Sequence, residues 1–289
     1  MLKNIILIFT RLYIEKIESS RQVEVFEQEM GKVGLRVVLY DNESFVEELQ
    51  GILQEYGITD SLFVADKQEA LALLREKGCF TVACYHEGVE GLFGLTQYAI
   101  EGLAGIEWDY LNKVYQRYCG IPWDITQTKR CRIREMGPQD LEDLYELYAD
   151  ERVTRYTEAL FKDREQERNY IEDYIENIYK YFGFGTWLIH RKEDGRLIGR
   201  AGFNFRPGFE EAELGFVIGY PFWRKGYAYE VCSHLLQLGR TVFEFNRIQA
   251  LADAENKASL CLLEKLGFIY AEDVTVDGHV YRRYLYDRL

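Results

Sequence analysis

The sequence predicts an α/β protein (α+β by some schemes) with two domains: a small Rossmann-like domain with a parallel sheet in residues 1–127, and a domain with a mixed, mostly antiparallel sheet in residues 130–289. Strands alternate with helices in the first half, which favours a parallel sheet covered by helices. Strands in the second half come in pairs joined by short turns, which favours antiparallel pairing. A break near residues 120–130, with Pro122 and a polar run, separates the two patterns. A length of 289 residues accommodates two such domains.

The first half contains short apolar segments, each followed by a helical pattern. Residues 1–18 begin with an apolar run interrupted by Arg11, which is too short to span a bilayer and lacks the small-residue cleavage site of a signal peptide. We expect a first strand or an amphipathic helix there. Strands are then predicted at 35–41, 61–66, 79–86 and 98–102, and helices at 43–56, 67–78 and 107–119.

Asp66 ends one of these predicted strands and precedes a helix. The segment 62–115 faintly resembles the later half of haloacid-dehalogenase-like or receiver-like α/β domains, which carry an acidic residue at this position. A phosphatase of that kind also needs two aspartates separated by one residue after its first strand, and residues 39–44 offer Asp41 alone. We therefore expect Asp66 to cap the following helix. The first domain is expected to be a non-catalytic platform, a dimer surface or a wall of the substrate cleft.

The second half has a different order of elements. A strand at 131–136 precedes a helix at 137–150, whose Pro138 lies near the helix start, where proline is favoured. A second helical zone covers 158–181. Two strands joined by a turn at residues 193–195 come next. The predicted elements from there on are strands at 186–192, 196–205 and 213–219, a helix from 228, a strand at 247–253, a helix from 255 to 267, and strands at 268–276 and 279–289.

Residues 213–240 carry the strongest functional signal, a strand followed by a glycine-containing loop and a helix. Gly226 lets the backbone approach a ligand closely. The first amides of the helix have no partner inside the helix, and the helix dipole adds positive charge there, so this end attracts an anion. Arg224 and Lys225 strengthen that charge. The stretch predicts a phosphate-binding site, although it is neither a Walker loop nor a GxGxxG motif.

The same loop resembles the acetyl-coenzyme A signature Q/R-x-x-G-x-G/A of the GNAT N-acetyltransferases, here Trp-Arg-Lys-Gly-Tyr-Ala at 223–228. Trp223 replaces the Gln or Arg of that pattern, as is usual in the ribosomal-protein N-acetyltransferases of the RimJ and RimL type. Residues 255–268 resemble a second family motif, N-x-x-(A/S)-x-x-x-x-x-K-x-G-F. The order of elements over 130–289 is also that of the GNAT fold. The residues that match the second motif are Asn256, Ser259, Lys265, Gly267 and Phe268.

The resemblance implies how acetyl-coenzyme A would be held. Its pantetheine arm would lie along the strand, against the backbone of Phe216, Val217 and Ile218, where one amide would polarise the thioester carbonyl. Asn256 would bond the pantetheine or order the turn at 253–259, and Ser259 lies beside it. The pyrophosphate would bind at the loop formed by Trp223, Arg224, Lys225, Gly226, Tyr227 and Ala228.

The catalytic candidates are Glu213 and Ser259. Glu213 lies on the strand that would line the acetyl site and is the candidate base; the alternative is an exposed carboxylate at the start of a strand. Many GNAT enzymes carry a tyrosine acid four residues after the position of Ser259, where this chain has Leu263. Ser259 is therefore the candidate acid, unless its hydroxyl bonds to the helix backbone. Tyrosines that either line the acceptor cleft or pack in the core are Tyr220, Tyr284 and Tyr286.

The predicted function is an acetyl-coenzyme A-dependent N-acetyltransferase that acts by direct attack of a primary amine, from a small molecule or a protein N-terminus. The alternative, suggested by the missing tyrosine, is a non-catalytic acyl-coenzyme A sensor or scaffold whose first domain binds a partner.

Composition narrows the partners. A net charge of −13 disfavours nucleic acid and anionic membranes. Six scattered cysteines and four scattered histidines show no metal-ligand spacing, so we expect no metal, reduced thiols and a cytoplasmic protein. A monomer and a homodimer both remain open.

Overall fold

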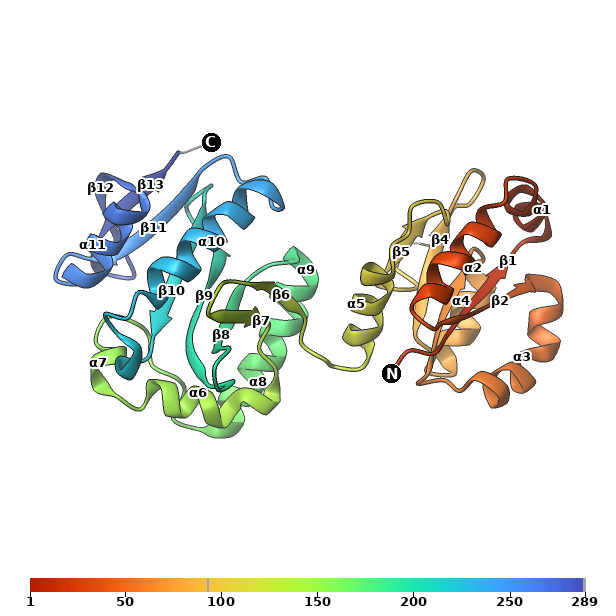
Figure 1. Cartoon of the computed structure of the whole chain (residues 1–289), viewed down its shortest axis with the longest axis horizontal. Coiled ribbons are helices and arrows are strands. Elements are labelled where there is room, and N and C mark those ends of the chain that lie inside the picture. The colour runs from red at the N-terminus through yellow and green to blue at the C-terminus, as the bar shows by residue number, and fades with distance from the viewer. Residues whose placement is uncertain (93, 288–289) are drawn as a thin grey trace. The chain divides into compact units, whose positions relative to one another are not determined.

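The computed structural model describes residues 1–92 and 94–287 and divides into two compact units, Met1–Ile121 and Pro122–Leu289. Each unit contains its own sheet (Figure 1). Across the described residues, no helix combines the length and the apolar character needed to cross a membrane.

The N-terminal unit has a five-stranded parallel sheet in the order β2-β1-β3-β4-β5, as the alternation of strands and helices predicts. The run at the N-terminus forms β1, an inner strand that lies between β2 and β3, and it is followed by two helices. The strands are β1 (Asn4–Phe9), β2 (Arg36–Asp41), β3 (Ser61–Ala65), β4 (Thr81–Tyr85) and β5 (Ala99–Glu101). The helices are α1 (Arg11–Ser19), α2 (Gln22–Lys32), α3 (Asn42–Tyr56), α4 (Gln68–Glu76) and α5 (Trp108–Tyr118).

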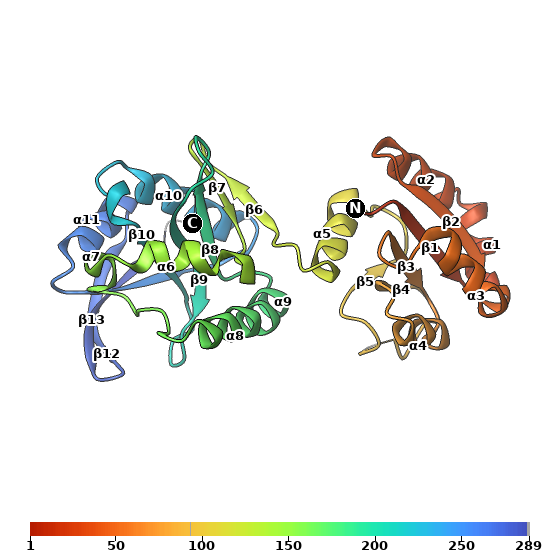
Figure 2. The same cartoon turned by 90° about the horizontal axis from the view of Figure 1, so that it is seen from below.

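Helices cover both faces of this sheet, because successive side chains of a strand point to opposite sides. Ile5 and Leu7 of β1 pack in the cluster that includes α1, α2 and α5. Ile6 and Ile8 pack in a second cluster with α3 and α4. Figure 2 shows the two helix layers of this unit from below. The strands are apolar on both faces, as is typical of buried parallel strands.

The C-terminal unit has an eight-stranded mixed sheet in the order β12-β13-β11-β10-β9-β8-β7-β6. Neighbouring strands are antiparallel, except that β10 and β11 run parallel. The strands are β6 (Asp124–Gln127), β7 (Cys131–Arg134), β8 (Thr186–Arg191), β9 (Leu197–Phe205), β10 (Ala212–Ile218), β11 (Ile248–Asp253), β12 (Ile269–Val276) and β13 (His279–Tyr286). The last strand is predicted at 279–289. Its residues 288–289 lie outside the described part of the chain.

Strand β6 changes the expected boundary between the two halves. The sequence pattern assigned residues up to 127 to the first domain, but β6 pairs antiparallel with β7. The strand escaped notice because its four residues include the polar Asp124 and Gln127, and only pairing with β7 makes it a strand. The compact units accordingly divide between Ile121 and Pro122.

The helices of this unit lie on both faces of its sheet. The predicted helix at 137–150 starts as a 3-10 turn, η1 (Pro138–Asp140), and the zone at 158–181 becomes helical only at Arg164, where the side chain of Asp163 accepts a hydrogen bond from the Glu165 amide. The helices are α6 (Leu141–Tyr148), α7 (Glu151–Thr154), α8 (Arg164–Tyr174), a π-helical stretch η2 (Ile175–Tyr179), α9 (Lys180–Phe182), a 3-10 turn η3 (Tyr220–Phe222), α10 (Tyr227–Thr241) and α11 (Lys257–Leu266).

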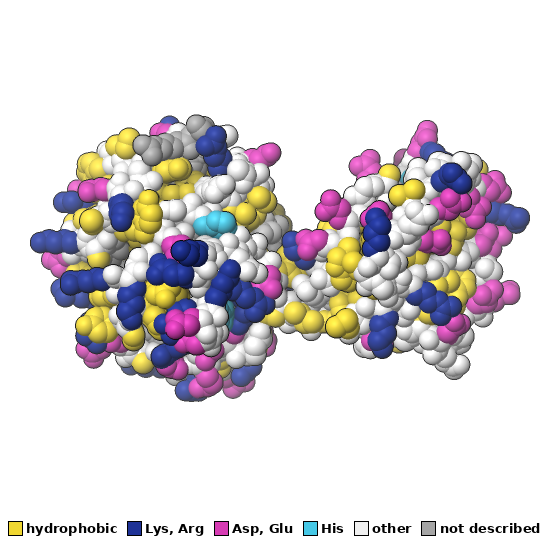
Figure 3. Space-filling view, in the orientation of Figure 1, with side chains coloured by type: hydrophobic (Ala, Val, Ile, Leu, Met, Phe, Trp, Pro, Cys, Tyr) yellow, Lys and Arg dark blue, Asp and Glu magenta, His cyan; other side chains and the backbone are white. Residues whose placement is uncertain are grey.

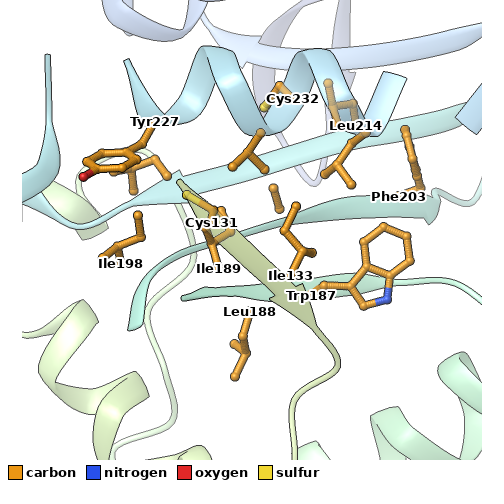
Figure 4. Close-up of a cluster of buried hydrophobic side chains, with 14 of the residues drawn as sticks. Cys131, Ile133, Trp187, Leu188, Ile189, Ile198, Phe203, Leu214, Tyr227 and Cys232 are labelled. Carbon is orange, nitrogen blue, oxygen red and sulfur yellow. The ribbon is translucent and has the colours of Figure 1, made fainter. Parts of the chain in front are cut away.

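Part of the core of the C-terminal unit lies between the sheet and α10. Trp187, Phe203 and Leu214 come from three neighbouring strands and point toward the helix that carries Cys232 (Figure 4). Leu188 points away from α10, to the opposite face (Figure 4). The opposite face is the side on which α6 and α8 lie.

Candidate coenzyme A site and acceptor face

Strand β10 is paired along its whole length on one side and along only part of it on the other. It pairs with β9 from Ala212 to Ile218. Pairing with β11 is confined, among the described residues, to Ala212 with Ile248 and Glu213 with Gln249. The two parallel strands therefore separate after Glu213, and the second half of β10 has an open edge.

Backbone alternation decides which groups face this opening. The Gly219 amide donates to the Ile198 carbonyl at 2.9 Å, so that residue faces β9. Polar groups of successive strand residues point to opposite sides, which directs Val217 toward β9 and both Phe216 and Ile218 toward the open edge. The indole of Trp223 donates to the Ile218 carbonyl at 2.6 Å, which agrees with this assignment. Of the three residues expected along a pantetheine arm, Phe216 and Ile218 have backbone groups directed toward the open edge and Val217 does not; the Ile218 carbonyl is already occupied by Trp223.

The loop that follows β10 is shaped by two left-handed residues. Arg224 has φ 58° and Gly226 has φ 80°, and Gly226 is the N-cap of α10. Left-handed turns of this kind, followed by a helix start, direct successive amides to one side and form a concave anion site. The side chains of Trp223, Arg224 and Lys225 are exposed around it, whereas Tyr227 is buried.

A further cation reaches the loop from elsewhere in the sequence. Arg130, between β6 and β7, donates to the Lys225 carbonyl at 2.9 Å, and its guanidinium lies 4.2 Å from the centre of the Tyr227 ring. Its Nε also donates to Glu230 at 2.6 Å, and this hydrogen bond raises the pKa of Arg130. Sequence reasoning missed Arg130, because it is about a hundred residues from its partners. Figure 3 shows Lys and Arg side chains gathered on the visible face of this unit.

The second motif forms the start of α11. Asn256 is the N-cap residue, and its Oδ1 accepts from the Ser259 amide at 3.2 Å. The Asn256 amide in turn donates to the Asp253 carbonyl at 3.0 Å, so this side chain and its backbone order the turn. No described residue hydrogen-bonds to the Ser259 hydroxyl. Leu263, at the position of the missing tyrosine, is buried in the core.

Glu213 is held by a neighbouring arginine rather than free at the start of a strand. Arg206 donates to both carboxylate oxygens, at 2.6 and 2.8 Å, and the Glu213 side chain is 12% exposed. Its partners across the sheet are Asn204 on β9 and Gln249 on β11, which share its face. Each carboxylate oxygen retains a lone pair that Arg206 does not occupy.

The remaining tyrosine candidates separate by burial. Tyr284 is buried and its hydroxyl lies 3.4 Å from the Glu264 carboxylate, while Tyr286 packs against Phe268. Tyr220 is partly exposed beside Trp223. Tyr156, which sequence reasoning did not single out, donates to the Glu255 carbonyl at 3.4 Å and connects the segment after α7 to the turn before α11.

Asp66 of the N-terminal unit does not cap α4, which corrects the expectation above. The N-cap residue of α4 is Lys67, and it makes no side-chain cap bond. The buried Asp66 carboxylate instead accepts from the amide and hydroxyl of Thr10 at 2.9 Å each, and lies 3.0 Å from His86 Nε2. Tyr13 stacks on the His86 ring with centroids 3.6 Å apart. The carboxylate thus ties together the ends of β1, β3 and β4.

Metal ligands were not expected, and among residues 1–92 and 94–287 there is no group of three or more His, Cys, Asp or Glu side chains arranged to hold a metal ion.

Comparison with known proteins identifies the C-terminal unit. Residues 130–269 match the family model described as an acetyltransferase (GNAT) domain. The chain is 33% identical over 143 residues to an uncharacterized N-acetyltransferase, p20, of Bacillus licheniformis, covering 49% of this chain and 80% of that protein. It is 32% identical over 146 residues to the uncharacterized N-acetyltransferase YoaA of Bacillus subtilis, covering 50% of this chain and 82% of the relative.

A solved structure of RimL, a ribosomal L7/L12 alpha-N-protein acetyltransferase, superposes with a TM-score of 0.50 at 15% identity, covering 58% of this chain and 95% of the other. At that identity the likeness concerns the fold. The family predicted from the loop and from the second motif is confirmed, and the chain belongs to the GNAT family of acetyltransferases.

Proposed function

We propose that this chain transfers the acetyl group of acetyl-coenzyme A to a primary amine, which attacks the thioester directly. The observation that supports this most is the open edge of β10 at Phe216 and Ile218, continuous with the concave loop at Trp223–Ala228. An extended ligand with amide groups can pair with such an edge as an added strand would. Its phosphates would then lie at the start of α10, among Arg130, Arg224 and Lys225.

Acetyl-coenzyme A would supply the activated thioester, and the chain's own residues would supply the rest. The Phe216 amide would polarise the thioester carbonyl, since it faces the opening and has no described strand partner there. Glu213 would accept the proton of the amine directly or through a water molecule. A base of this kind helps because an amine with a pKa of about 10.4 is mostly protonated at neutral pH.

Ser259 is the candidate donor for the departing thiolate, because its hydroxyl has no other described partner. A thiolate whose conjugate thiol has a pKa of about 8.5 is a good leaving group and needs little protonation. We therefore expect Ser259→Ala to slow turnover only a few-fold.

Two classes of acceptor fit the proposal so far: a small amine and a protein N-terminus. The likeness to RimL favours neither, because 15% identity reflects the fold. The competing function is an acyl-coenzyme A sensor that binds without turning over.

The test is to measure coenzyme A release from acetyl-coenzyme A against a panel of small amines and N-terminal peptides, with calorimetry of coenzyme A binding in parallel. Release that depends on acceptor supports the proposal. Binding without release across the panel supports the sensor, and the absence of binding contradicts both. Each run needs a blank without acceptor, because the free thiols of Cys119 and Cys261 are exposed and react with thiol reagents.

A further inference from the structure

Arg200 lies in the middle of β9, on the face of the sheet opposite α10. It pairs with Leu188 of β8 and with Val217 of β10, and directly opposed residues share a face. Figure 4 shows Leu188 pointing away from α10. The Arg200 side chain therefore enters the space between the sheet and the helices α6 and α8.

The guanidinium of Arg200 has no carboxylate partner among the described residues. Its Nε is buried without a hydrogen bond, and its Nη2 lies 3.8 Å from the Met136 sulfur. Arg200 as a whole is half-buried. Charged groups withdrawn from water are normally paired, because an unpaired charge loses hydration without compensation. Burial acts to lower the pKa of Arg200, but surrounding tyrosines outweigh it and the group is charged.

Nearby acids do not neutralise this charge. Glu167 is buried on α8, but its carboxylate accepts from the Phe161 amide at 2.9 Å and forms no ion pair with Arg200. Glu158 also acts on Tyr170 electrostatically without pairing with the arginine. A singly charged cation thus remains in a largely aromatic surrounding.

Four tyrosines surround Arg200, and two of them have hydroxyl groups to spare. Tyr174 bonds to Asn204 at 2.7 Å and to the Thr186 amide at 2.8 Å, and Tyr179 bonds to the Thr186 carbonyl at 2.5 Å. The hydroxyls of Tyr148 on α6 and Tyr170 on α8 have no hydrogen bond to another described residue. Tyr170 is 42% exposed, so this group of tyrosines is in contact with solvent at Tyr170.

We propose that Arg200, together with the hydroxyls of Tyr148 and Tyr170, binds a carboxylate of the acceptor, and that the acceptor is a small molecule of the amino-acid class. One cation and two neutral donors suit a single negative charge better than a phosphate dianion. The inference rests on the proposed function, because it assumes that the acceptor amine meets the thioester near Phe216.

The position of Arg200 indicates that the carboxylate it binds belongs to the acceptor. Val217, its partner on β10, is adjacent to Phe216, and neighbouring strands lie about 4.8 Å apart. A molecule that carries an amine and a carboxylate a few bonds apart can reach both places. In a protein N-terminus the α-carboxyl group of the first residue is part of a peptide bond and carries no charge. Such an acceptor would leave Arg200 without this partner.

The experiment compares amines that differ only in the carboxylate: tyrosine with tyramine, phenylalanine with phenethylamine, and lysine with cadaverine. We expect kcat/KM to favour a carboxylate member by at least about 30-fold, the usual effect of a buried charge pair. Arg200→Gln should abolish the preference and Arg200→Lys should keep part of it. Arg196→Gln, at an exposed ion pair with Glu146 just before β9, is the matched control and should leave the preference intact.

A binding measurement keeps the inference testable apart from turnover. Calorimetry would compare N-acetyltyrosine with N-acetyltyramine, using wild type and Arg200→Gln at equal coenzyme A affinity to establish correct folding. Tighter binding of the carboxylate form in wild type alone supports the site even if no acceptor turns over, in which case only the proposed function fails. Equal binding of the two probes, or a preference that survives in Arg200→Gln, overturns the inference.

Discussion

The polar ends of the two sheets differ in whether their hydrogen bonds are complete. In the N-terminal unit the buried Asp66 carboxylate is surrounded by donors from Thr10 and by His86, all within 3.1 Å. In the C-terminal unit the edge of β10 has backbone groups at Phe216 and Ile218 directed into an opening. The first arrangement holds strands together, whereas the second is incomplete until something else pairs with it. Unpaired polar groups, more than polar residues as such, distinguish a ligand site from an internal brace.

The largest expected effect comes from a substitution that places a side chain inside the loop after β10. Gly226→Val places a branched side chain at φ 80° and 3.5 Å from Arg130 Nη2, in the space proposed for the pyrophosphate. We expect coenzyme A binding to be lost in calorimetry. Gly278→Val, at φ 81° in the β12–β13 turn with no neighbour within 4 Å, introduces similar backbone strain away from the loop and should keep full affinity. Unchanged affinity in folded Gly226→Val would show that this loop is not the pyrophosphate site.

The second effect concerns proton removal. Glu213→Gln keeps the shape and part of the bonding to Arg206 but cannot accept a proton, so kcat/KM should fall by about 10²–10⁴-fold with coenzyme A affinity unchanged. Both proteins should be measured across a range of pH with an amine of known pKa, and their profiles should differ. Superimposable pH profiles for the two proteins would exclude Glu213 as the base. Catalysis would then depend mainly on positioning an amine that is already neutral.

The third test separates the two units. Residues 122–289 alone should give a folded protein, because the C-terminal unit has its own sheet and core. Residues 130–289 should unfold at lower denaturant, since the cut removes β6 and the hydrogen bonds of Thr126 to His234 and of Thr128 to Glu230, both under 3 Å. Equal midpoints for the two fragments would place the boundary at 130, and an unfolded 122–289 would make the two halves one cooperative unit.

The smallest effect on activity is expected at the hydrogen-bond network of Asp66, Thr10 and His86. Asp66→Ala leaves Thr10 and His86 without their buried partner and should lower the free energy of unfolding of the N-terminal unit by about 3 kcal/mol. Coenzyme A affinity and turnover should not change. Asp60→Ala, which breaks an exposed pair with Lys3, is the control and should destabilise less. Loss of turnover in a folded Asp66→Ala protein would mean that this network takes part in function.

Local patterns account for what the sequence predicted well. The helix α11 is delimited by Asn256 and Gly267, both of which act within a few residues, and the loop at Gly226 needs only its own left-handed backbone. The features that escaped prediction depend on distant partners. Strand β6 exists through β7, Asp66 is explained by Thr10 and His86, and Arg130 acts on a loop about a hundred residues away. The isolation of Arg200 is visible only once all its neighbours are known.

The separation of β10 from β11 has a consequence for association. A free strand edge ordinarily invites another protein's strand and leads to aggregation. Here the open edge lies between two strands that are joined at Glu213 and Gln249, in the middle of an eight-stranded sheet. A foreign strand carries side chains on both faces, and the narrow gap where β10 and β11 separate leaves little room for them. An unbranched chain with few amides has no such side chains and can enter the gap. The same fork that would admit a cofactor arm therefore limits β-pairing at this edge, and we expect no association of the protein through this edge even without ligand.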